Sequence, residues 1–277
     1  MVTDYYTGHN EIEHCNVFGY SFVQYITFFL LQFYYLIIRV RKLIPYKLWF
    51  CYIIIRMKTL VVIPAYNEQD CIRDTVNSVK KYGYDYLVIN DYSRDNTAQI
   101  LDNENMNHLD LPMNLGLAGV TRVGFKYAHE YGYDCVVCID GDGQHLPEYM
   151  HLLIKEIENG SDYVVGSRFV SKKKPMSMRM LGSRLLCWLI KLKTGQKVSD
   201  PTSGMRAVGR KIIGEFDKSM NYYAEPDTMC HLIRKGYKVK EIQVEMKERE
   251  TGVSYFRSPF RSMYFMLSNI LSIVFVQ

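Results

Sequence analysis

Apolar positions from residue 59 onward fall into two patterns that alternate along the chain. Short runs rich in Val and Ile predict strands at 59–64, 86–91, 135–140 and 162–166. Between them, segments whose apolar residues recur every three or four positions predict helices at 70–82, 95–105, 122–131 and 147–158. Strands that alternate with helices in this way predict an α/β fold with a mostly parallel central sheet covered on both faces.

The first 56 residues follow a different pattern. No charged residue occurs from Cys15 to Ile38, a stretch long enough to span a bilayer as a helix. Acidic residues precede this stretch and basic residues follow it, so the positive-inside rule would place the rest of the chain in the cytoplasm. No small-residue cleavage site follows, which disfavours a signal peptide. Because Met57 is also a natural start for the domain, residues 1–56 are interpreted either as a membrane anchor or as an upstream extension.

Two later segments also combine apolar and basic character. Between positions 172 and 193 the pattern predicts a basic amphipathic helix, which suits a membrane surface or packing on the domain with lysine ends in solvent. The run at 263–276 is apolar but short for a membrane span, so we expect it to be interfacial or part of the core. The predicted boundaries are a domain at 57–250 and an apolar tail at 251–277.

Composition narrows the class of protein. A net charge of +5 suits attraction to phosphates or an anionic membrane face and is too weak to argue for nucleic acid. The seven cysteines have no framework spacing, which indicates a reducing compartment. Cys135 and Cys138 would face opposite sides of a strand, so buried free thiols are favoured over a metal clamp. No Gly-x-Gly-x-x-Gly follows a strand and no Walker loop is present, which argues against a dehydrogenase or an NTPase.

Acidic residues follow three of the predicted strands. Glu68 comes after the first strand, Asp91 after the second, and Asp140 and Asp142 after the third. In an open parallel sheet, ligands bind at the carboxyl ends of the strands, so we expect these carboxylates at one edge. Gathered carboxylates repel one another unless a cation lies among them. We therefore predict that Asp140 and Asp142 bind Mg²⁺ or Mn²⁺ together with a diphosphate.

The ordered set of motifs resembles that of family 2 glycosyltransferases. The matching segments are Val62–Glu68, Asn90–Thr97, Asn114–Gly116, Asp140–His145, Gly166–Phe169, Asp200–Arg206 and Glu225–Asp227. Within the family, the chain is most similar to the branch that makes dolichyl-phosphate or polyprenyl-phosphate hexoses. The resemblance implies a single Rossmann-like domain of the glycosyltransferase A type that binds a nucleotide sugar.

The resemblance also implies roles for individual residues. Contacts to the donor nucleotide are expected from Pro64, Tyr66 and Glu68, with Ile89 and Asp91 at the base. Metal and diphosphate contacts are expected from Asp140, Gly141, Asp142 and Gln144. Phosphate contacts are expected from Arg168 and Arg206. His145 is interpreted either as a ligand or as a residue behind the ligands. Tyr92 and Arg94 depart from the family pattern, Tyr92 standing where glycine is usual, and alter the wall of the nucleotide pocket.

Family 2 enzymes invert at the anomeric carbon by direct displacement, so no side-chain nucleophile is expected. Asp142 and Arg168 are then expected to stabilise the leaving group. A hydroxyl acceptor would need a general base, for which the candidates are Asp200, Glu225 and Asp227. A lipid phosphate is already an anion and would instead be oriented by Arg168, Arg179 and Arg184.

The function predicted from the sequence is transfer of a hexose from a UDP-, GDP- or dTDP-sugar to a polyprenyl phosphate. The enzyme would act at the cytoplasmic face of the membrane, either as a peripheral protein or anchored by residues 15–38. The alternative is the same fold with a cell-surface glycan or a lipid-linked saccharide as acceptor.

Overall fold

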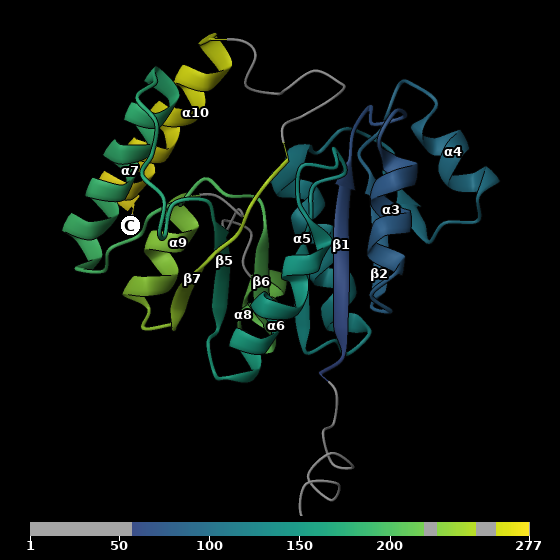
Figure 1. Ribbon diagram of the computed structural model, residues 1–277, viewed down its shortest axis with the longest axis horizontal. Coiled ribbons are helices and arrows are strands. Elements are labelled where there is room, and N and C mark those ends of the chain that lie inside the picture. The colour runs from purple at the N-terminus through teal and green to yellow at the C-terminus, as the bar shows by residue number, and fades with distance from the viewer. Residues whose placement is uncertain (1–56, 219–225, 248–258, 277) are drawn as a thin grey trace, which may run out of the picture. The chain divides into compact units, whose positions relative to one another are not determined.

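A seven-stranded sheet forms the centre of the computed structural model, which describes residues 57–218, 226–247 and 259–276 (Figure 1). The strands lie in the order β3-β2-β1-β4-β6-β5-β7. Their bounds are β1 (Thr59–Ala65), β2 (Asp85–Asn90), β3 (His108–Asp110), β4 (Cys135–Cys138), β5 (Tyr163–Ser167), β6 (Arg206–Gly209) and β7 (Val239–Gln243). Neighbouring strands are parallel, except that β6 runs antiparallel to β4 and β5.

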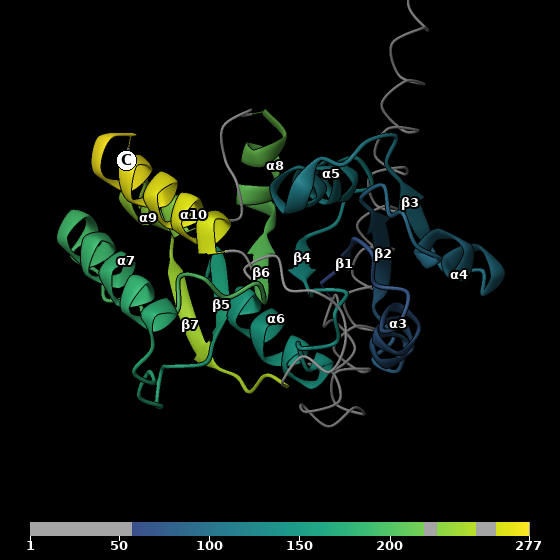
Figure 2. The same ribbon diagram turned by 90° about the horizontal axis from the view of Figure 1, so that it is seen from above.

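Helices cover both faces of the sheet, as Figure 2 shows. The first face carries α3 (Ile72–Lys80) and α6 (Met150–Glu158), with the short helix η1 (Pro147–Tyr149) before α6. The second face carries α5 (Gly116–Glu130), α8 (Arg210–Lys218) and α9 (Pro226–Arg234). Farther out, α7 (Met178–Thr194) and α10 (Pro259–Leu271), which continues into η3 (Ser272–Val276), pack against α9 and against each other. The remaining helix, α4 (Thr97–Asn103), contacts α3.

The central strands appear as continuous apolar runs because both of their faces are buried. In β1, Leu60 and Val62 join the core beneath α5, whereas Val61 and Ile63 join the core beneath α3. Helix α5 lies directly on the sheet, since a Cβ atom at Gly124 would be 2.7 Å from Val62. This burial fixes the direction of each strand, and with it the position of the loop that follows.

The four predicted strands and the four helices between them are confirmed, with ends shifted by a few residues. The largest shift is in the helix predicted at 122–131, which begins at Gly116 in α5. The basic helix predicted from residue 172 begins only at Met178, because Pro175 precedes it and the Ser177 side chain accepts a hydrogen bond from the Met180 amide at 3.3 Å. Lys172, Lys173 and Lys174 therefore lie in the preceding loop, and their assignment to the helix was wrong.

The two close cysteines are buried and free, as predicted. Burial raises the pKa of the Cys138 thiol to about 12 and raises the pKa of Cys135 further. Such thiols are inert at neutral pH.

Among the described residues, no helix is both long enough and apolar enough to cross a membrane. The segment 15–38 predicted as an anchor, together with the rest of 1–56, lies outside the described residues. Glu225 and the start of the predicted tail, 251–258, lie outside them as well. The predicted domain boundaries stay predictions.

Candidate active site

One edge of the sheet collects the loops that carry the predicted site residues. The parallel strands β1, β2, β4, β5 and β7 all end at this edge, and the antiparallel strand β6 begins there. We call it the carboxyl edge. The loops after β1, β2, β4 and β5 and the loop 199–205 before β6 therefore meet along it.

Asp140 is fixed from two sides and open on another. The backbone amide of Asp140 donates to His145 Nδ1 at 3.0 Å, and His145 Nε2 lies 3.6 Å from Asp140 Oδ2. A Cβ atom at Gly204 would lie only 2.6 Å from Asp140 Oδ2, so the loop before β6 reaches the carboxylate at a distance that glycine alone permits. The Asp140 side chain still keeps 37% of its surface exposed. His145 thus lies behind the carboxylate, with both ring nitrogens facing Asp140.

Gly141 ties the acidic loop to the end of β1. Its amide donates to the Pro64 carbonyl at 3.1 Å, and a Cβ atom at this position would be 2.7 Å from the same oxygen. On the other side, Thr75 Oγ1 donates to the Gly141 carbonyl at 3.2 Å. The backbone between Asp140 and Asp142 is therefore held against the sheet.

Asp142 and Gln144 lie in the turn that follows. The Gln144 amide donates to Asp142 Oδ1 at 3.1 Å, and Gln144 Nε2 donates to the Lys247 carbonyl at 3.3 Å. Within the described part of the chain, no group of three or more His, Cys, Asp or Glu side chains could hold a metal ion. Asp140 and Asp142 instead suit a cation whose other ligands are phosphate oxygens and water, which is how Mg²⁺ is often bound.

The carboxylate of Asp91 faces the start of α5. Its Oδ1 accepts from the Leu115 amide at 2.6 Å and its Oδ2 accepts from the Gly116 amide at 2.9 Å. Burial raises the pKa of Asp91, and these two amide hydrogen bonds oppose the rise. The contact explains why α5 begins earlier than predicted, since a carboxylate stabilises the amino terminus of a helix. Ile89 is fully buried beneath α5, so its side chain is not at the carboxyl edge where base contacts were expected.

Tyr66 and Tyr92 are the exposed aromatic residues beside these loops, with 44% and 52% of their surface exposed. Tyr92 has φ of 60°, a backbone conformation that favours glycine. This explains why glycine is the usual family residue at that position. The loop of Glu68 is joined to the loop after Tyr92, because the Glu68 amide donates to Thr97 Oγ1 at 3.0 Å and the Asn67 amide donates to Ser93 Oγ at 3.0 Å.

Arg168 and Asp200 form a two-point ion pair. Arg168 Nε donates to Asp200 Oδ2 at 2.7 Å and Arg168 Nη2 donates to Asp200 Oδ1 at 3.0 Å. The Asp200 side chain is completely buried, whereas that of Arg168 keeps 26% of its surface exposed. Asp200 therefore lies where it orients Arg168, with no exposed surface on which to meet an acceptor as a general base.

Arg206 points into the protein. It is 4% exposed and donates to the Tyr163 hydroxyl at 2.9 Å and to the Ser203 carbonyl at 2.7 Å. Its guanidinium thus supports the loop 201–203 and is not at the surface where a phosphate contact was expected. Asp227 is also engaged elsewhere, since its carboxylate accepts from Ser272 Oγ at 2.7 Å and joins α9 to the terminal helix.

The arrangement of acidic loop, arginine and parallel sheet agrees with the comparison with known proteins. The family model for glycosyl transferase family 2 matches residues 60–216. The chain belongs to this family. The enzyme is thus a glycosyltransferase, as the sequence predicted.

Two curated relatives indicate the branch that this glycosyltransferase resembles. A UDP-N-acetylglucosamine–dolichyl-phosphate N-acetylglucosaminyltransferase of Methanococcus voltae is 32% identical over 222 residues, which cover 71% of this chain and 88% of the relative. A polyprenol monophosphomannose synthase of Mycolicibacterium smegmatis is 28% identical over 212 residues, which cover 71% of this chain and 80% of the relative.

A solved structure confirms the glycosyltransferase A type of fold. Glucosyl-3-phosphoglycerate synthase from Mycobacterium tuberculosis, in complex with Mn²⁺ and UDP-glucose, superimposes with a TM-score of 0.60 over 79% of each chain. Because the sequences are only 16% identical, this likeness concerns the fold alone.

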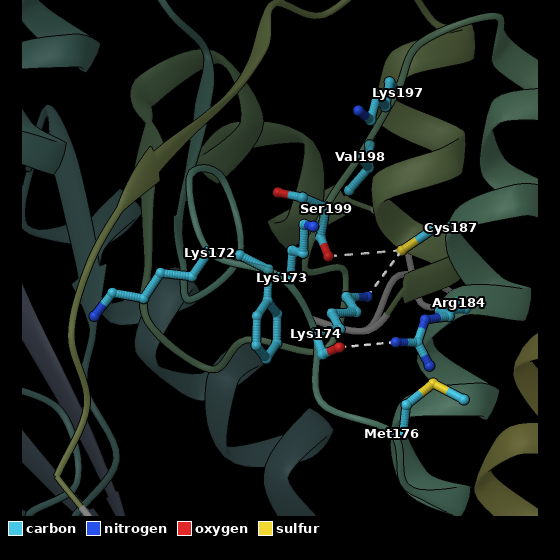
Figure 3. Close-up of a pocket in the computed structure, with 10 residues that line it drawn as sticks. Lys172, Lys173, Lys174, Met176, Arg184, Cys187, Lys197, Val198 and Ser199 are labelled. Atoms are coloured by element: carbon cyan, nitrogen blue, oxygen red, sulfur yellow. Dashed lines mark hydrogen bonds between the residues drawn. The ribbon is translucent and has the colours of Figure 1, made fainter.

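The glycosyltransferase has a basic pocket of about 630 Å³ (Figure 3), whose lining includes Phe169 and Ser199, the chain neighbours of Arg168 and Asp200. Its walls come from the loop after β5, from α7 and from the loop before β6, and consist of Phe169, Lys172, Lys173, Lys174, Met176, Arg184, Cys187, Lys197, Val198 and Ser199. Lys174 Nζ donates to Cys187 Sγ at 3.2 Å, and Arg184 Nη2 donates to the Lys174 carbonyl at 2.8 Å. Arg184 was predicted from the sequence, whereas Lys197 was missed because it follows the end of α7 at Thr194 and only the fold places it beside the loop of Lys172, Lys173 and Lys174.

Alanine at Gly204 should impair this glycosyltransferase without unfolding it. The added methyl would occupy the space of Asp140 Oδ2, so the carboxylate must turn away. A misplacement of about 1 Å in an active site can cost about a hundredfold in rate, so we expect a fall of about ten- to a hundredfold in kcat/KM. The measurement is steady-state transfer, with circular dichroism to check folding.

The matched control for this change is Gly209→Ala, at the far end of strand β6, the strand that follows the loop of Gly204. A Cβ atom at Gly209 would meet its nearest neighbour, the Asp162 carbonyl oxygen, at an ordinary 3.4 Å. Activity should stay within about twofold there, since no site residue moves. Equal activity losses in the two variants would contradict the role assigned to Gly204.

Proposed function

We propose that this glycosyltransferase transfers a hexose from a nucleotide sugar to a polyprenyl phosphate, with inversion at the anomeric carbon. The observation that carries the proposal is the loop between Asp200 and Gly204, which connects two charged groups. Asp200 binds Arg168 at one end, and Gly204 contacts the Asp140 carboxylate at the other. An acidic metal-binding group and an arginine at one edge suit the departure of a nucleoside diphosphate.

The donor side of the proposal rests on Asp140 and Asp142. These residues would hold Mg²⁺ or Mn²⁺, with Gln144 beside them, and the ion would neutralise charge that develops on the leaving diphosphate. The Mycobacterium tuberculosis enzyme of the same fold was crystallised with Mn²⁺ and UDP-glucose, which supports a divalent cation and a nucleotide sugar. The donor in this proposal is a UDP-, GDP- or dTDP-sugar, with Tyr66 and Tyr92 exposed on the nucleotide side.

The acceptor side rests on the basic pocket. Cations from Lys173, Lys174, Arg184 and Lys197 would attract a phosphate, while Phe169, Met176 and Val198 offer apolar contacts to the first isoprene units. A phosphate oxygen is already anionic and needs no general base to attack the anomeric carbon. The engagement of Asp200 and Asp227 in internal hydrogen bonds fits such an acceptor, and both relatives bear names of enzymes that act on polyprenyl lipids.

The membrane side rests on two adjacent helices with exposed apolar residues. In α7 these residues recur at the spacing of one helical stripe, and they are Met178, Leu181, Leu185, Trp188 and Leu192. In α10 and η3 they are Met263, Tyr264, Leu267, Leu271 and Phe275. The two helices touch, since a Cβ atom at Gly182 would be 2.8 Å from Met266. Exposed apolar stripes with lysines beside them suit peripheral binding to the cytoplasmic face of a membrane.

The test is transfer of radiolabelled sugar from UDP-, GDP- and dTDP-hexoses, with and without polyprenyl phosphate in anionic vesicles. We expect lipid-dependent transfer from one donor, and co-sedimentation of the enzyme with the vesicles.

Lys197→Gln should raise the KM for the lipid about fivefold, which corresponds to about 1 kcal/mol. Lys211→Gln is the matched control, because Lys211 pairs with Asp162 at the opposite edge of the sheet. A transfer rate that does not depend on polyprenyl phosphate but requires an added saccharide would overturn the proposal in favour of a glycan acceptor.

A further inference from the structure

The edge strand β7 sends two polar side chains toward the Arg168–Asp200 pair. Glu241 Oε1 accepts from the Asp200 amide at 2.8 Å, while Glu241 Oε2 accepts from the Ser199 amide at 2.6 Å and from Ser199 Oγ at 2.8 Å. Glu241 is the acceptor in all three hydrogen bonds, and a carboxylate can accept on both of its oxygens. Glu241 therefore holds the backbone of the loop that carries Asp200.

Gln243 makes the equivalent contacts to the loop that carries Arg168. Its Nε2 donates to the Arg168 carbonyl at 3.0 Å, and its Oε1 accepts from the Ser171 amide at 2.9 Å. This residue has to donate and accept at once, as an amide does. Residues two apart on a strand share a face, so Glu241 and Gln243 act from the same side of β7.

The Arg168–Asp200 pair needs such support because neither residue lies in a strand. Strand β5 ends at Ser167 and β6 begins at Arg206, so both members of the pair are in loops beyond the sheet. The pairing of β7 with β5 places Gln243 opposite Ser167, next to the start of the Arg168 loop. Lys240 lies on the opposite face of β7 and pairs with Glu156 of α6 at 2.6 Å.

We propose that Glu241 and Gln243 are positioning residues that set the orientation of the Arg168 guanidinium through Asp200 and through the Arg168 backbone. The inference rests on the proposed function, in which Arg168 engages phosphate. In this proposal the orientation of Arg168 toward the phosphate is set by β7, a strand that lies outside the phosphate-binding loops. Glutamine at position 241 would turn an NH₂ group toward one or two of the three donors, depending on the orientation of the amide, and would loosen the Asp200 loop.

The test compares Glu241→Gln with Arg168→Lys and with the double variant. We expect Arg168→Lys to have a strong effect on one of three kinetic parameters: kcat, the KM for the donor or the KM for the acceptor. Glu241→Gln should change the same parameter by about tenfold. In the Arg168→Lys background, Glu241→Gln should add less than about twofold, because residues that act as a unit are not additive. Glu241→Asp, which keeps the carboxylate, should restore part of the loss.

Lys240→Met is the matched control on the same strand. It removes the ion pair with Glu156 and should leave kcat and both KM values within about twofold, whatever it does to the melting temperature. If Arg168→Lys has no effect, the proposed function fails. If Arg168→Lys has an effect but Glu241→Gln has none, or one that multiplies fully in the double variant, the positioning role is overturned while the proposed function stands.

Discussion

Asparagine in place of Asp140 should slow sugar transfer by about 10²- to 10³-fold at saturating donor and Mn²⁺. The substitution keeps the size of the side chain but removes its charge, so it should weaken the proposed cation site, which would stabilise the leaving diphosphate. Folding should be little affected, because the hydrogen bond between this residue and His145 Nδ1 comes from the backbone amide. The measurements are kcat and a titration of activity with Mn²⁺, whose apparent affinity should also fall.

Asp134→Asn is the matched control for this substitution. Asp134 precedes the same strand β4 at its other end, and its carboxylate pairs with Arg210 at 2.9 Å. It is therefore a structural carboxylate at the opposite edge of the sheet, and its replacement should cost no more than about 1 kcal/mol of stability. Transfer should stay within about twofold. A variant at Asp140 that keeps more than a third of the activity would refute the metal-binding role.

The sequence predicted those strands that are buried on both faces. In β4, Cys135 to Cys138 are all buried, so each of these positions is apolar and the strand appears in the sequence as a continuous apolar run. Strand β7 was missed because it is an outermost strand of the sheet, where Lys240, Glu241 and Gln243 interrupt the apolar pattern. Strand β6 was missed because it begins with Arg206, whose buried charge is satisfied by acceptors that only the fold brings near.

Site residues that directly follow a predicted strand could be located from the sequence, and their partners could not. Asp140 and Arg168 were assigned to one edge because each follows a strand of a parallel sheet. Nothing local indicates that Gly204 contacts Asp140, since the contact depends on the antiparallel course of β6. Likewise, Asp200 was predicted as a candidate general base, and its ion pair with Arg168, which the sequence does not indicate, places it where it can orient that arginine.

Asp200→Asn should lower kcat/KM by about a hundredfold and also reduce stability. The amide can accept from Arg168 with its oxygen, but its NH₂ group would face the second donor of the guanidinium, so the two-point pair is lost. Removing one partner of a buried ion pair costs about 3–5 kcal/mol, and the partial exposure of Arg168 reduces this to about 2–3 kcal/mol. The measurements are denaturant unfolding and steady-state kinetics well below the melting temperature.

Asp162→Asn is the control that separates the loss of stability expected for Asp200→Asn from its loss of activity. The Asp162 side chain is only 12% exposed, pairs with Lys211 and accepts from the Lys238 amide, and it lies at the start of β5, far along the strand from Arg168. Its replacement should cost stability and leave kcat/KM within about twofold, because no group at the carboxyl edge moves. An orienting Asp200 also predicts that Asp200→Asn keeps the shape of the pH–rate profile. If the variant instead loses the acidic limb of that profile, Asp200 acts as the general base, and a hydroxyl acceptor replaces the lipid phosphate.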